Sequence, residues 1–228
     1  AMMAMAAGSA NAAEQTLVVL DASGSMWGQI EGRPKLEIAR DALAAALAAM
    51  PADSSVGLMA YGHRRKGDCG DIEQVVPPAP GNAAAINRAV AGMKFLGMTP
   101  LTESVRQAAH SLRYTEQAAR VILITDGVET CDADPCALGE ALAMSGVDFT
   151  VHVVGFGLSA EEGRQVACLA ENTGGRYVQA DDMAALGQAL TQTMVSEPAP
   201  SPLPDAGLSA PQSAAVASTL TVQWRGPG

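Results

Sequence analysis

The chain has 228 residues, with 24 acidic against 14 basic side chains and a formal net charge of −10. This balance argues against general nucleic-acid binding, which needs a basic face to neutralise phosphates. Hydrophobic residues make up 48% of the chain and aromatic residues 4%, so the expected core is built mainly from Ala, Val, Leu and Met side chains.

The N-terminal residues 1–13 are small and apolar, and Ala10-Asn11-Ala12 matches the A-x-A pattern at which secretory signal peptides are cleaved. We interpret this stretch as a signal-peptide remnant; an Ala-rich helix start is the alternative. No apolar stretch approaches the ~20 residues that a membrane span needs. The sequence therefore predicts a periplasmic or secreted protein without a transmembrane segment.

Strand and helix patterns alternate along the middle of the chain. Apolar runs predict strands at 17–20, 56–61, 72–76, 121–124, 149–154 and 176–180. Helical periodicity with suitable end signals predicts helices at 34–50, 82–93, 102–114, 135–145, 160–172 and 183–195. This alternation predicts βαβ units, a mostly parallel sheet and helices on both faces. The strand at 72–76 has no room for a crossover helix before it, so we expect an antiparallel edge strand.

Beyond residue 195 the composition changes. Residues 196–217 are rich in Pro, Ala and Ser, which is typical of an extended linker. Within 218–228 the run Leu220-Thr221-Val222-Gln223-Trp224 alternates as a strand does. We expect the start of a truncated β-rich domain here, with a disordered tail as the alternative.

Oxygen-bearing side chains follow two of the predicted strands. Asp21, Ser23 and Ser25 come directly after the first strand, and Asp126 follows the strand at 121–124. Thr99 stands in the loop that leads into the helix at 102–114. The carboxyl ends of parallel strands meet at one edge of a sheet, where ligands bind. Two carboxylates and three hydroxyls suit a hard divalent cation, whereas the first loop taken alone also fits an ordinary helix cap.

These three segments together resemble a known family. Asp21-Ala22-Ser23-Gly24-Ser25, Gly97-Met98-Thr99-Pro100-Leu101 and Thr125-Asp126-Gly127 match the pattern of the metal-ion-dependent adhesion site (MIDAS) of von Willebrand factor A (vWA) domains. The resemblance covers about residues 15–195. Within the family, the chain is most similar in kind to bacterial exported vWA proteins. It implies a doubly wound α/β fold, Rossmann-like, with one antiparallel edge strand.

The resemblance also implies a mechanism. Ser23, Ser25 and Thr99 would ligate Mg²⁺, or alternatively Mn²⁺ or Ca²⁺. Asp21 and Asp126 would complete the site directly or through water. An acidic side chain, Asp or Glu, from a protein partner would then fill the open position on the ion.

Two neighbouring features are candidate partner contacts. Met26 and Trp27 follow the first loop directly, and an exposed Trp beside a site often anchors an interface; packing beneath the loop is the alternative. A basic run follows the second strand and should lie on the same rim, where it would steer an acidic partner. An ordinary solvated loop is the alternative for this run, which consists of His63, Arg64, Arg65 and Lys66.

Four cysteines in an exported chain favour disulfides. They are Cys69, Cys131, Cys136 and Cys168, and no C-x-x-C pair suggests zinc. Cys131–Cys136 is the local pairing. Cys69–Cys131 with Cys136–Cys168 is the long-range pairing, which we favour because it includes all four.

Enzyme signatures fail in this chain. The serines lack a G-x-S-x-G elbow, and the Gly62–Gly67 spacing that resembles a phosphate loop is followed by Asp68 where Lys is required. We therefore expect no catalytic residues and predict a divalent-cation-dependent protein-binding module. The alternatives are an envelope structural or assembly subunit with a stabilising metal and a metal-dependent hydrolase.

Overall fold

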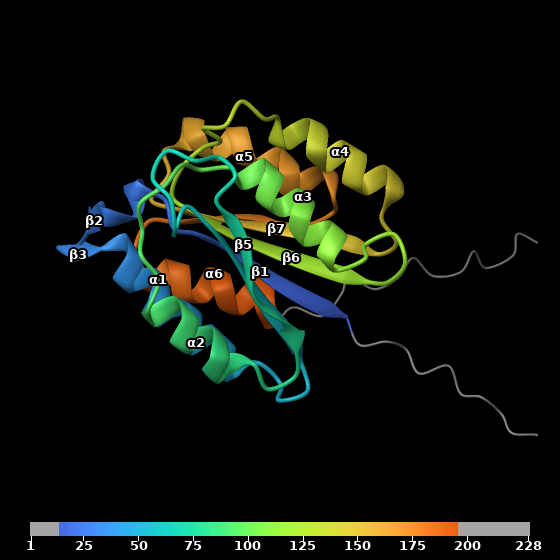
Figure 1. Cartoon of the computed structure of the whole chain (residues 1–228), viewed down its shortest axis with the longest axis horizontal. Helices are drawn as coiled ribbons and strands as arrows, with labels where there is room; N and C mark the ends of the chain where they lie inside the picture. The colour runs from blue at the N-terminus through green and yellow to red at the C-terminus, as the bar shows by residue number, and fades with distance from the viewer. Residues whose placement is uncertain (1–13, 196–228) are drawn as a thin grey trace, which may run out of the picture. The chain divides into compact units, whose positions relative to one another are not determined.

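The computed structural model describes residues 14–195. At its centre is a six-stranded sheet with the strand order β5-β4-β1-β6-β7-β8 (Figure 1). Its strands are β1 (Gln15–Asp21), β4 (Ser55–Tyr61), β5 (Ile72–Ala79), β6 (Ala119–Thr125), β7 (Phe149–Phe156) and β8 (Tyr177–Ala180). All neighbouring pairs are parallel except β4 and β5. The predicted mostly parallel sheet with one antiparallel edge strand is confirmed.

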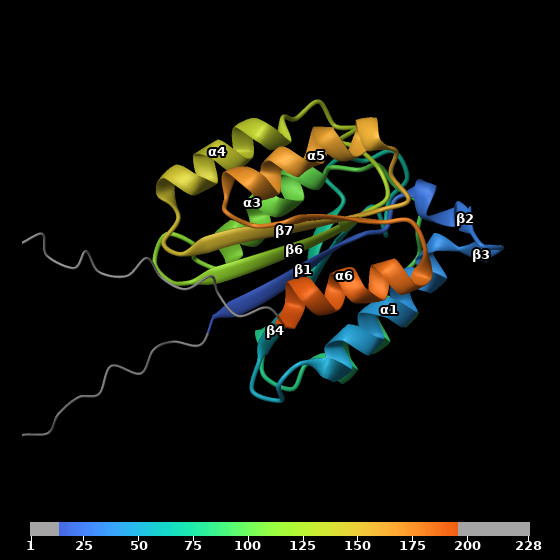
Figure 2. The ribbon, with the colours of Figure 1, turned by 180° about the vertical axis from the view of Figure 1, so that it is seen from behind.

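Helices cover both faces of this sheet. One face carries α1 (Lys35–Ala49), α2 (Ala83–Ala91) and α6 (Met183–Val195), and Figure 2 shows α1 and α6 side by side. The other carries α3 (Leu101–Ser111), α4 (Pro135–Ser145) and α5 (Ala160–Asn172). None of the described helices is long and apolar enough to cross a membrane.

Strand β1 shows why this sequence folds into three layers. Val18 and Leu20 face the core beneath α1, α2 and α6, whereas Leu17 and Val19 face the core beneath α3, α4 and α5. All four side chains are buried. A strand covered on both faces needs apolar residues at every position, which explains the continuous apolar run. Each such side chain contributes about 1.5–3 kcal/mol to stability through its burial.

The edge strand β5 is longer than the run at 72–76 predicted. It continues through Pro77 and Pro78, which an edge strand tolerates because one side of its backbone has no ladder partner. The pairing with β4 shifts register between Val56 and Leu58. A Cβ atom at Gly57 would lie 2.7 Å from the Pro78 nitrogen, so only glycine permits this close approach.

The segment between β1 and α1, expected as a loop, contains three short elements. A 3-10 helix, η1 (Gly24–Trp27), is followed by a hairpin of β2 (Gln29–Ile30) and β3 (Arg33–Pro34). The hairpin turn has φ of 53° at Glu31 and 78° at Gly32. Such turns favour Asn-Gly or Asp-Gly, so Glu-Gly gave a weak signal. The hairpin feeds directly into α1.

Three expectations concern segments outside the described residues. They are the signal-peptide remnant at 1–13, the linker at 196–217 and the β-rich segment at 218–228, and all three stay predictions.

Candidate metal and partner-binding site

The candidate site lies at the carboxyl edge of the sheet. Strands β1 and β6 are parallel neighbours, with Leu20 paired to Ile124, so Asp21 and Asp126 emerge close together. The loop before α3 joins them through a parallel bridge between Ser23 and Gly97. The structure therefore brings together the three segments that carry the five predicted ligands.

Asp21 is buried, and both of its carboxylate oxygens accept hydrogen bonds. Its Oδ1 accepts a hydrogen bond from the Ser23 amide at 2.7 Å, and its Oδ2 accepts one from the Thr125 hydroxyl at 2.9 Å. Burial, followed by the nearby Asp126 charge, raises the pKa of Asp21 to about 6, although the hydrogen bonds from Ser23 act in the opposite direction. Ionised Asp21 therefore lacks a compensating positive charge, which a bound cation would supply.

The two serines connect Asp21 to Asp126. The hydroxyl oxygens of Ser23 and Ser25 are 2.8 Å apart, and the Ser25 hydroxyl donates to Asp126 Oδ1 at 2.6 Å. Asp126 Oδ2 accepts from the Lys35 ammonium at 3.0 Å. The result is a continuous row of oxygen atoms along the edge of the sheet.

Thr99 completes this set from the loop before α3. Its amide donates to the Thr130 hydroxyl at 2.8 Å, and the Thr130 amide donates back to its carbonyl at 3.1 Å. A Cβ atom placed on Gly127 would lie 3.8 Å from both Ser25 Oγ and Thr99 Oγ1. Both hydroxyls therefore border the same small space, which the missing side chain of Gly127 leaves open.

This donor set fits a hard divalent cation. Two carboxylates and three hydroxyls offer oxygen atoms alone, which Mg²⁺, Mn²⁺ and Ca²⁺ prefer. Across residues 14–195 no group of three or more His, Cys, Asp or Glu side chains forms a metal site. The hydroxyls are thus essential to any ion held here.

Three further residues contact the site or its loops and belong to none of the sequence motifs described above. Lys35 opens α1 and reaches Asp126. Glu129 accepts from the amide of Thr102 at 2.9 Å and from that of Cys131 at 2.7 Å, and Thr130 holds the Thr99 backbone. Glu129 and Thr130 follow the Asp126 motif closely, but they also hold Thr102 at the start of α3 and Thr99 in the loop before it. Only the folded chain shows these contacts.

The basic loop after β4 lies on the predicted rim. The carbonyl of Gly62, which begins the loop, accepts from the amide of Gly97 at 2.8 Å. The loop's charge is compensated internally: Arg64 pairs with buried Asp71 at 2.7 Å and Arg65 with Asp68 at 3.0 Å.

Two further residues of this loop differ in exposure. His63 contacts Glu73 at 2.9 Å, and its side chain is 10% exposed, whereas Lys66 is exposed.

Burial acts to raise the pKa of Asp71, but hydrogen bonds from the amides of Arg64 and Arg65 and from the Arg64 guanidinium outweigh it and lower this pKa. Steering of a partner by this loop stays a prediction.

The two residues after the first motif differ in exposure. Met26 is wholly buried in the core beneath α1, so its expected role as a partner contact is wrong. The geometry of η1 explains this burial, because the 3-10 helix directs the Met26 side chain inward. Trp27 is 58% exposed, and its indole donates to the Phe95 carbonyl at 2.9 Å. Trp27 therefore stays a candidate contact beside the site.

The structure contains two disulfides, Cys69–Cys131 and Cys136–Cys168. This is the long-range pairing that the sequence favoured. The first joins the basic loop to the loop after Asp126, and the second joins α4 to α5. The first disulfide thus connects two of the loops that surround the candidate site.

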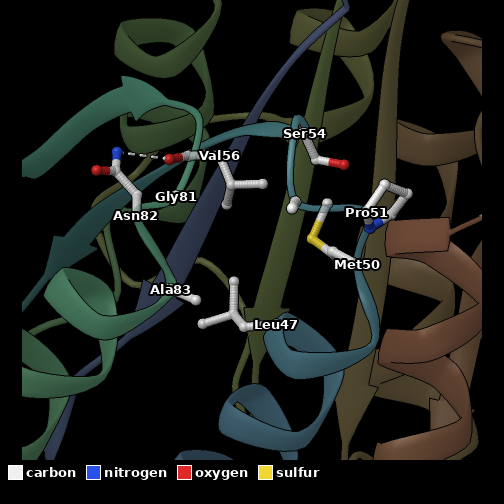
Figure 3. Close-up of a pocket in the computed structure, with 9 residues that line it drawn as sticks. Leu47, Met50, Pro51, Ser54, Val56, Gly81, Asn82 and Ala83 are labelled. Atoms are coloured by element: carbon white, nitrogen blue, oxygen red, sulfur yellow. Dashed lines mark hydrogen bonds between the residues drawn. The ribbon is translucent and has the colours of Figure 1, made fainter.

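A separate pocket lies near the start of β4, away from the strand ends that form the site. Its cavity of about 70 Å³ is lined by Leu47, Met50 and Val56, among others (Figure 3). Asn82, which also lines it, donates to the Val56 carbonyl at 2.9 Å. Small-molecule pockets usually measure about 300–1,000 Å³, so this one is too small for a ligand of that kind.

Comparisons with known proteins identify the family and the fold. The family profile described as von Willebrand factor type A domain matches residues 16–129. The uncharacterized protein YwmD of Bacillus subtilis is 27% identical over 181 residues, covering 75% of this chain and 81% of YwmD.

Two solved structures share the fold. The pilus adhesin SpaC from Lactobacillus rhamnosus GG superposes with a TM-score of 0.65 at 19% identity, covering 81% of this chain but only 30% of SpaC. Proximal thread matrix protein 1 from the mussel byssus, solved with a zinc-occupied MIDAS motif, gives a TM-score of 0.58 at 16% identity, with 81% of this chain and 48% of that chain covered.

Proposed function

This chain belongs to the von Willebrand factor type A domain family, and on that premise we propose that it is a divalent-cation-dependent protein-binding module. The ion, Mg²⁺ or alternatively Mn²⁺ or Ca²⁺, supplies an open coordination position that takes an Asp or Glu side chain from a partner. The observation that carries this proposal is the meeting of Asp21, Ser23, Ser25, Thr99 and Asp126 at one edge of the sheet.

The residues of such a site would have different roles, as ligands of the ion or as groups that position the ligands. The hydroxyls of Ser23, Ser25 and Thr99 provide neutral donors, so the two carboxylates alone set its negative charge. Asp21 orients the first loop through the Ser23 amide, and Thr130 positions Thr99. An ion held by two carboxylates keeps little net charge of either sign, so a third carboxylate from outside can serve as a further oxygen ligand.

A binding role fits the surrounding chemistry better than catalysis does. The four cysteines are joined in disulfides, so none of them is available as a thiol nucleophile. His63 pairs with Glu73, His110 is exposed on α3, and His152 accepts from the Arg176 amide at 3.1 Å from within the sheet. None of these three contacts an oxygen of the candidate site.

We also infer that the protein works in the periplasm or outside the cell. Its two disulfides need an oxidising compartment, and structural neighbours include a pilus adhesin. A structural role with a stabilising metal is the second candidate, favoured by the likeness to a byssus matrix protein that holds zinc at its MIDAS motif.

Calorimetric titration with Mg²⁺ and Mn²⁺ tests the proposal directly. We expect saturable binding by the wild type and a loss of at least tenfold in affinity for Asp21→Ala and for Thr99→Ala. Asp53→Ala changes an exposed aspartate before β4 and should leave affinity unchanged.

Partner capture separates the two candidates. Immobilised wild-type protein should retain an exported protein in Mg²⁺ and release it in EDTA, whereas Asp21→Ala should capture nothing. Equal capture with and without EDTA would contradict the proposal.

A further inference from the structure

Lys35 occupies a slot that leads to the candidate metal site. It is the first residue of α1, and its amide donates to the Gly28 carbonyl at 2.8 Å. A Cβ atom at Gly28 would lie 3.7 Å from Lys35 Cε, and one at Gly157 would lie 3.2 Å from Cε and 3.4 Å from Nζ. The Lys35 side chain therefore runs past Gly28 and close against Gly157, where an added Cβ atom would crowd it.

The slot delivers a positive charge to a metal ligand. Lys35 Nζ lies 3.0 Å from Asp126 Oδ2, and their side chains are 15% and 0% exposed, respectively. A pair this sheltered is screened far less by water and salt than a surface pair. The other oxygen of Asp126 accepts from Ser25, so Lys35 and Ser25 together fix the orientation of this carboxylate.

The ammonium changes the charge balance of the site. Asp21 and Asp126 with Lys35 carry one net negative charge when both carboxylates are ionised, and a divalent ion would make this net charge positive. Without Lys35 the loaded site would be neutral. A positive site attracts an anionic ligand and binds the divalent ion itself less tightly, since like charges repel.

We propose that Lys35 is a specificity-determining residue of this site, which lowers the affinity for the divalent ion and raises the preference of the loaded site for carboxylate ligands. This inference rests on the proposed function, because it needs an ion held by Asp21 and Asp126. Lys35 thereby strengthens the binding of a carboxylate partner at the expense of affinity for the ion.

Mn²⁺ serves as the probe, because the relaxation rate of water protons reports both the bound ion and the water molecules on it. For Lys35→Met we expect about tenfold tighter Mn²⁺ binding, which corresponds to about 1.4 kcal/mol. At saturating Mn²⁺, acetate displaces bound water, and the acetate concentration for half displacement should rise about threefold to tenfold. Neutral acetamide should show no difference between the two proteins.

Two variants complete the experiment. Lys35→Arg keeps the charge and should preserve the acetate preference. Arg33→Met removes a positive charge two residues away, from a guanidinium that pairs with Asp41 at 2.7 Å, and should leave both constants unchanged.

The outcomes separate this inference from the proposed function. Equal Mn²⁺ and acetate affinities in the wild type and Lys35→Met would overturn the inference while the metal site stands. Weaker Mn²⁺ binding by Lys35→Met would also overturn it and show that Lys35 serves only to hold Asp126. A wild type that binds no Mn²⁺ would refute both proposals.

Discussion

At the scale of single residues, the candidate site brings together carboxylates whose burial is unfavourable when they are ionised. A bound cation would offset this unfavourable burial energy. Asp21 is fully buried with Asp126 close by, and burial and this second charge raise its pKa to about 6. Thr125 and the Ser23 amide supply its hydrogen bonds. The arrangement is preorganised for an ion, because the protein has already oriented these oxygens.

The raised pKa of Asp21 predicts a specific pH dependence in the metal-free protein. An aspartate that titrates near 3.8 unfolded and about 6 folded contributes stability below the unfolded pKa and loses it as pH rises through the folded one. In EDTA, wild-type stability relative to Asp21→Asn should therefore fall between about pH 4 and pH 6. Urea unfolding at several pH values measures this difference.

Saturating Mg²⁺ provides the control for this pH effect. A bound ion favours the ionised carboxylate, so the wild type should gain stability over Asp21→Asn as pH rises. A pH-independent difference between the two proteins in EDTA would contradict the raised pKa.

At the scale of elements, sequence patterns predicted the strands and helices well because burial on both faces of the sheet imposes continuous apolar runs. The ends of elements were harder to predict. The helix expected at 102–114 ends at Ser111, and Arg113 beyond it adopts a φ of 57°, a conformation that local sequence does not reveal. Met26 was misjudged for a similar reason, since η1 alone directs it into the core.

The site shows the same division between local and long-range information. The five predicted ligands come from motifs that each lie within five consecutive residues. Lys35, Glu129 and Thr130 act through partners 91, 27 and 31 positions away, respectively. Such pairs depend on how loops fold against one another, which spacing in one sequence cannot supply.

The two disulfides offer a matched test of how loops support the site. Replacing both cysteines of either pair with serine should cost about 3–4 kcal/mol of stability, because the loops that they close are of moderate length. Cys69–Cys131 joins the basic loop to the loop after Asp126, whereas Cys136–Cys168 joins two helices. Removal of the first pair should weaken Mn²⁺ binding several-fold more than removal of the second.

Titration of both double variants under conditions where each is folded, as circular dichroism shows, measures this effect. Equal Mn²⁺ affinities in the two variants would mean that the disulfides stabilise the fold without shaping the site.

At the scale of the whole molecule, stability and metal binding are linked by mass action. The sheet and its two helical layers form extensive apolar cores on both faces, so the fold should persist without an ion. An ion that binds only the folded state adds about 2.7 kcal/mol at a concentration one hundred times its dissociation constant. For a domain of this size that corresponds to a rise in Tm of about 5–11 °C.

This rise distinguishes a binding module from a subunit that needs its metal to fold. Thermal unfolding of the wild type should shift upward with Mg²⁺ and return to its starting value in EDTA, with native secondary structure retained at 25 °C. Asp21→Ala should show no shift, and Asp53→Ala should behave as the wild type. Loss of the folded state in EDTA at 25 °C would instead favour the structural role, because a site that only exchanges ligands has no need to hold the fold together.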